Sequence, residues 1–81
     1  AEALRLFRPG PLYTPGERVL AVRSSRGLNQ PQLAELASCG RSHLSHIERG
    51  TRPLTASMAA GLARALGVTA EYLLTGKGSD G

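Results

Sequence analysis

The chain has 81 residues, 41% of them hydrophobic and only 4% aromatic, which predicts one domain with a small aliphatic core rather than a large cleft. Its formal net charge of +4 and sequence pI of about 10.2 point to nucleic acid as a partner, or less strongly to an anionic membrane surface. The single cysteine excludes an internal disulfide, and no apolar run approaches the ~18 residues of a membrane span.

Residues 1–13 are expected to form an extended arm, because apolar and arginine residues alternate there before Pro9-Gly10-Pro11 stops any regular element. Arg5 and Arg8 interrupt the apolar stretch, so no signal peptide is predicted, and a cytoplasmic, nucleoid-associated location is expected. Two roles stay open for the arm. Its arginines can contact nucleic acid, or it can cover Leu20, which the following helical pattern leaves toward the surface. The second role is favoured.

The folded domain is expected within residues 14–76, with a flexible tail at 77–81. Its first helix begins at Thr14 as N-cap, with Pro15 in the first turn and Glu17 in capping-box position, and it runs to about Ser25.

The second helix begins at Asn29 as N-cap, and Gln32 completes its capping box. It runs to about Ala37, and its pattern places Leu33 and Leu36 on one face. A short turn, Ser38-Cys39-Gly40, then leads to the next helix.

The third helix is expected at about residues 41–48 and carries the most informative pattern of the chain. At roughly 100° per residue, Leu44 and Ile47 lie together on one side. The opposite arc is polar and holds Arg41, Ser42, Ser45, His46 and Arg49. Two turns of helix are not stable alone, so the second helix must hold this one, which gives a helix-turn-helix arrangement. Arginine can bind guanine bidentately, and serine and neutral histidine both donate and accept, so this arc suits base edges.

Two more helices complete an all-α fold, since no strand and no internal repeat is predicted. Thr55 caps a fourth helix that runs to about Leu66, and Thr69 caps a short fifth helix, Ala70 to Leu74, which Gly76 ends. The inward residues of the fourth helix are expected to be Met58, Leu62, Ala65 and Leu66.

The stretch "GLNQPQLAELASCGRSHLSHIERGTRP", followed by "LARALGVTAEYLLTG", resembles the lambda-repressor-like, Cro/repressor (XRE-type) helix-turn-helix domains. The resemblance covers about residues 16–76. It implies a compact five-helix bundle that binds double-stranded DNA sequence-specifically in a prokaryotic or phage transcriptional regulator, with repression favoured. It also implies that the third helix enters the major groove, and that a homodimer binds an inverted-repeat operator.

The same resemblance assigns roles to individual residues. Arg41, Ser42 and His46 would face bases, with Ser45 close by. The phosphate contacts would come from Gln30, Arg49 and Arg52. Independently of the resemblance, His43 lies at the edge of the polar arc, where it is a candidate for a further phosphate contact, and simple solvation explains it equally well. Arg26 is a weaker candidate for phosphate, Arg64 is expected to be solvated, and Arg23 is expected to pair with Glu48.

Two positions depart from the family pattern. Ser38 stands in the turn where the family usually has glycine, so a positive φ there would strain the residue. Gly40 stands where a serine or threonine usually caps the third helix, and glycine offers no side chain for capping.

The rival interpretations of this stretch are a metal site and a catalytic cluster. Cys39, His43 and His46 have helical spacing, but no fourth ligand follows at a standard distance, so no metal and no cofactor is expected. No acid–base pair or nucleophile set is apparent, so an enzyme is not expected, and no small-molecule ligand is evident. The alternative that stays open is a protein-interaction module, such as an antitoxin, in which DNA binding is secondary.

Overall fold

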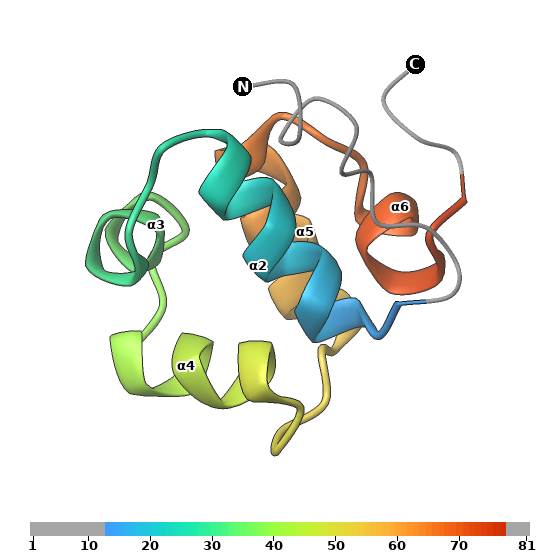
Figure 1. The fold of residues 1–81 in the computed structure, drawn as a ribbon, viewed down its shortest axis with the longest axis horizontal. Coiled ribbons are helices and arrows are strands. Elements are labelled where there is room, and N and C mark those ends of the chain that lie inside the picture. The colour runs from blue at the N-terminus through green and yellow to red at the C-terminus, as the bar shows by residue number, and fades with distance from the viewer. Residues whose placement is uncertain (1–12, 78–81) are drawn as a thin grey trace.

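The computed structural model describes residues 13–77, which form an all-helical domain without strands (Figure 1). The expected arm and tail lie outside the described residues, apart from Tyr13 and Lys77. The helices are α2 (Pro15–Ser25), α3 (Gln30–Leu36), α4 (Arg41–Arg49), α5 (Ala56–Leu66) and α6 (Ala70–Thr75). Within this part of the chain, no helix is both long enough and apolar enough to cross a lipid bilayer.

The predicted capping residues set the helix starts. Thr14 and Glu17 exchange two hydrogen bonds at the start of α2, at 2.9 and 3.1 Å between nitrogen and oxygen. Asn29 and Gln32 do the same at the start of α3, at 2.8 Å each. In each pair, two backbone N–H groups that would otherwise be left to solvent at the helix start donate to side-chain oxygens. The predicted bounds are confirmed to within one residue at the helix ends.

Figure 1 shows α2 crossing in front of α5, with α6 on one side and α3 on the other, while α4 lies along the lower edge. Each helix contributes a fully buried aliphatic side chain to one shared core, namely Val19, Leu33, Leu44, Leu62 and Leu73. Small residues let the helices approach closely, as Ala34, Ala59 and Ala63 are also buried. The predicted aliphatic core is therefore confirmed, and it leaves α4 with one side free of the other helices.

One predicted inward position differs from the structure. Leu36 is 60% exposed, because the buried stripe of α3 runs through Leu33 and Ala34, and Leu36 projects from the flank of the helix beyond that stripe. In α5, Met58 and Ala65 are half-buried and pack against the core as predicted, and Ala59 and Ala63 are buried as well, beside Leu62 and Leu66. Leu20 is 42% exposed, in keeping with its predicted surface position.

Arg18 is a buried residue that the sequence pattern did not identify. It is 2% exposed, and its Nε and Nη2 donate to the carbonyl oxygens of Leu73 and Leu74, both at 3.0 Å, while Nη1 donates to the Tyr13 carbonyl. Burial lowers the pKa of this guanidinium below its ordinary value. Arg18 therefore satisfies carbonyl groups near the C-terminal end of α6 and fixes that helix against α2.

Candidate nucleic-acid interface

The turn between α3 and α4 has the strained geometry that its sequence predicts. Ser38 has φ of 56°, the single positive φ among the described non-glycine residues. The Cys39 N–H donates to the Ala34 carbonyl at 2.9 Å, which closes the turn. Gly40 is the N-cap of α4 with extended φ and ψ of −74° and 140°, and it provides no side-chain hydrogen bond. The turn thus holds α4 firmly although both departures from the family pattern are present.

Cys39 has a structural role in this turn. Its side chain is half-buried against the core, and burial raises the pKa of its thiol above the usual value. A raised pKa leaves less thiolate at neutral pH, so this environment does not activate the sulfur as a nucleophile.

The two sides of α4 differ as the helical pattern predicts. Leu44, Ile47 and Glu48 are buried, at 0%, 1% and 5% exposure. The opposite side consists of the exposed Arg41, Ser42 and Arg49, the half-buried Ser45 and His46, and, at its edge, the half-buried His43. The predicted polar arc is therefore a real surface of the domain, and its side chains come from one rigid helix.

Glu48 connects three helices through its buried carboxylate. Arg23 of α2 donates to it twice, from Nε to Oε2 at 2.7 Å and from Nη2 to Oε1 at 3.0 Å. Gln30, at the start of α3, donates from Nε2 to Oε1 at 2.9 Å. The expected Arg23–Glu48 pair is thus confirmed, and the network fixes α4 relative to both α2 and α3.

Gln30 was predicted from the family resemblance to contact phosphate. The structure places it beside α4, half-buried, with one amide hydrogen engaged by Glu48. An amide has a second N–H and a carbonyl oxygen, so the bond to Glu48 leaves Gln30 with groups for a further contact while limiting its rotamers.

Gly16 allows α2 to approach α4 very closely, a contact that sequence reasoning missed. A Cβ on Gly16 would overlap the Ile47 carbonyl oxygen and lie 3.2 Å from that of Glu48. The first turn of α2 thereby meets the last turn of α4, and opposite ends of the two helix dipoles face each other. The signal in the sequence, "TPGE", predicted only a helix start.

The loop after α4 is tied back to the helix. Gly50 has φ of 82° and ends α4, and the Thr51 N–H donates to the His46 carbonyl at 3.0 Å. The Thr51 hydroxyl lies 2.8 Å from His46 Nδ1 and donates to the His46 carbonyl at 3.2 Å. Thr51 thus restricts the His46 ring, which was one of the predicted base-facing residues, and nothing in the sequence indicated this contact.

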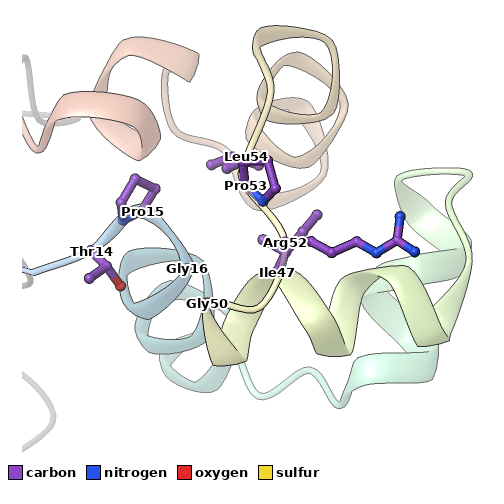
Figure 2. A pocket seen from close by; sticks show the side chains of 8 residues that line it. All are labelled: Thr14, Pro15, Gly16, Ile47, Gly50, Arg52, Pro53 and Leu54. Carbon is purple, nitrogen blue, oxygen red and sulfur yellow. The ribbon is translucent and has the colours of Figure 1, made fainter.

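An open hollow of about 320 Å³ lies between the start of α2 and the end of α4 (Figure 2). Its lining consists of Thr14, Pro15, Gly16, Ile47, Gly50, Arg52, Pro53 and Leu54. Figure 2 shows the Arg52 side chain extending alongside α4, away from Thr14 and Pro15. Arg52 is exposed, so its guanidinium is accessible to solvent in the loop that follows α4.

The other arginines among the described residues, Arg26 and Arg64, differ in their surroundings. Arg26 donates from Nε to the Leu66 carbonyl at 3.0 Å, so it satisfies the C-terminal end of α5. Arg64 on α5 is exposed. In the described part of the chain, no three histidine, cysteine, aspartate or glutamate side chains are grouped so as to hold a metal ion.

A short helix held by a tight turn and a buried ion pair, with a polar outer face, defines a helix-turn-helix domain of the lambda-repressor-like type. The sequence matches the helix-turn-helix domain family over residues 16–79. The chain belongs to this family.

Two curated relatives and one solved structure illustrate the similarity. The immunity repressor protein of Bacillus phage phi105 is 44% identical over 55 residues, which is 68% of this chain and 38% of the repressor. The control protein C.SmaI of Serratia marcescens is 37% identical over 62 residues, 76% of this chain and 74% of the control protein. The P22 c2 repressor, solved in complex with a synthetic operator, superposes with a TM-score of 0.75 at 26% identity, covering 80% of this chain and 98% of that one.

Proposed function

We propose that this domain represses transcription by placing α4 in the major groove of an operator. The observation that carries the proposal is the division of α4 into a buried side, Leu44, Ile47 and Glu48, and an outward polar side. A major groove about 12 Å wide admits one α-helix. The polar side then meets the base edges, with Arg41, Ser42, Ser45 and His46 as the reading residues.

Phosphate contacts flank the reading residues in this proposal. Arg49 is exposed at the end of α4, Arg52 lies in the loop that follows, and Gln30 stands at the start of α3. His43, at the edge of the arc, completes the set. Such contacts fix the orientation of the helix on the duplex and carry most of the salt-dependent affinity.

The operator is proposed to be an inverted repeat bound by two copies of the chain. A helix of nine residues reaches only a few base pairs, so two copies about one helical turn (~34 Å) apart are needed for a specific site. Support comes from the relatives, which include two repressors, one of them solved on a synthetic operator. These relatives favour DNA binding over a role as a protein-interaction module. The proposed place of action is the cytoplasm.

Replacement of Arg41 by alanine tests the assignment of the reading surface. The site is first obtained by selection from random DNA, which also reports half-site spacing and symmetry. On the selected duplex, the Arg41→Ala change is expected to cost about 1–3 kcal/mol of binding free energy and to relax the preference at one base pair. On random duplex the loss is expected to be much smaller.

Arg64→Ala is the matched control, because it removes the same charge from an exposed position on α5. It is expected to leave the affinity for the selected duplex nearly unchanged. Equal losses on selected and random duplex for Arg41→Ala would make Arg41 a phosphate contact. The absence of binding to any duplex at low salt would reject the proposed function and favour the protein-interaction alternative.

A further inference from the structure

Two contacts of the Thr51 hydroxyl bear on which ring nitrogen of His46 carries the proton. The hydroxyl oxygen of Thr51 lies 2.8 Å from His46 Nδ1 and 3.2 Å from the His46 carbonyl oxygen. A hydroxyl has one proton to donate, and a carbonyl oxygen can only accept. Both contacts are hydrogen bonds only if the hydroxyl donates to the carbonyl and accepts from Nδ1–H.

This carbonyl also accepts the N–H groups of Thr51 and Arg52, at 3.0 and 3.3 Å. The cluster joins the end of α4 to the loop, so the side chain of Thr51 is held in place by backbone geometry. The histidine ring is consequently fixed through Nδ1, and it does not rotate freely on the surface of α4.

We infer that neutral His46 presents an unprotonated Nε2 to the operator, and thus reads a base that offers an amino group. The inference rests on the proposed function, because it specifies what one of its reading residues recognises. A neutral imidazole with a proton on Nδ1 has Nε2 as an acceptor. Within the described residues no hydrogen bond to Nε2 is present, so this acceptor is available to a ligand.

In the major groove, the donors are the N6 amino group of adenine and the N4 amino group of cytosine. Guanine presents two acceptors there, N7 and O6, and thymine presents O4 and a methyl group. An acceptor at Nε2 pairs with an amino group and is repelled by the guanine and thymine oxygens. His46 is therefore a specificity-determining residue for adenine or cytosine, and Thr51 is the positioning residue that gives it this preference.

The first test measures the tautomer of His46 in the free chain. Long-range ¹H–¹⁵N NMR spectra at about pH 8, where imidazole side chains in general are neutral, distinguish protonated from unprotonated ring nitrogens. The expected result is a protonated Nδ1 in the wild type and in Thr51→Ser, and a shift toward protonated Nε2 in Thr51→Val, which lacks the hydroxyl. His43, the other histidine of α4, serves as an internal reference and is expected not to change. A wild-type His46 with the proton on Nε2 overturns the inference.

The second test measures base preference on the selected duplex. The position that His46 contacts is the one at which the His46→Ala variant loses its base preference. At that position, duplexes carrying each of the four bases are then compared for their affinity to the wild-type chain. Adenine or cytosine is expected to bind roughly two- to tenfold more tightly than guanine or thymine, as one hydrogen bond to a base edge allows. Thr51→Val is expected to reduce this preference, and Thr51→Ser to retain it.

The outcomes separate the two proposals. If the chain binds the duplex but prefers guanine or thymine at the position that His46 contacts, this inference is overturned and the proposed function is left intact. Failure of every duplex to bind overturns the proposed function and the base preference together, while the tautomer measured in the free chain is unaffected by that failure.

Discussion

Replacement of Arg23 by alanine is expected to lower the free energy of unfolding by about 3–5 kcal/mol, because it leaves a buried carboxylate without its cation. The Glu48 side chain is fully buried, and that of Arg23 is 13% exposed. Without Arg23, the Gln30 amide is the one partner of this carboxylate that remains among residues 13–77. The measurement is urea or thermal unfolding of the purified chain, followed by circular dichroism.

Two control variants distinguish the loss of the buried ion pair from the effect of removing an arginine at any other position. Arg64→Ala changes an exposed arginine on α5 and is expected to alter stability by no more than about 0.5 kcal/mol. The double change Arg23→Met/Glu48→Met removes both charges together and is expected to cost less than Arg23→Ala alone. A loss below about 1 kcal/mol for Arg23→Ala, as for a pair at the surface, would show that the pair does not hold α4 in place.

The second large effect is expected from Gly16→Ala, which we predict to destabilise the domain by about 2–3 kcal/mol. In an ordinary helix the same change is stabilising by about 0.5–1 kcal/mol, because glycine loses more chain entropy on folding. Here the added Cβ overlaps the carbonyl oxygen of Ile47. Backbone cannot rotate away as a flexible side chain does, so α2 and α4 must separate. Thermal unfolding measures the loss.

Gly61→Ala provides the matched comparison within the same domain. A Cβ on Gly61, in α5, has the Ala37 carbonyl oxygen as its nearest neighbour at 3.4 Å, which is ordinary contact. This variant is expected to gain about 0.5–1 kcal/mol. If Gly16→Ala were as stable as Gly61→Ala, the close approach of α2 and α4 would not exist in solution.

Local signals predicted the helices of this chain well. Thr14, Asn29, Thr55 and Thr69 each cap a helix start as expected, because capping depends on side chains within three residues. The periodicity of α4 likewise predicted correctly which of its sides is buried and which is exposed. Leu36 was misplaced because a seven-residue helix touches its neighbours along a narrow stripe, and the pattern alone does not give the width of that stripe.

Two of the features that sequence reasoning missed, the burial of Arg18 and the close approach at Gly16, depend on contacts between distant parts of the chain. Arg18 is buried because the end of α6, 55 residues further on, supplies carbonyl acceptors. Gly16 is required because Ile47 passes over it, and Thr51 reaches His46 only because the chain turns at Gly50. In the sequence, Arg18 looks like any other arginine of a basic domain. Its role becomes visible only when the packing of the helices is known.

Two sets of hydrogen bonds hold the site residues of α4 in place. Glu48 joins α4 to Arg23 and Gln30 from beneath, and Thr51 restrains His46 at the end of the helix. A reading helix held in this way keeps its side chains in fixed positions before DNA arrives, so little ordering is required on binding. The rigidity of α4 is therefore part of the proposed recognition.

NMR chemical-shift mapping of the ¹⁵N-labelled chain with the selected duplex measures whether the outward face of α4 meets DNA. The largest changes are expected along α4 and at the start of α3, at Gln30, Arg41, Ser42, Ser45 and His46, with Arg52 in the following loop. Changes confined to α6 and the exposed side of α5, with α4 unaffected, would show that DNA does not bind to α4.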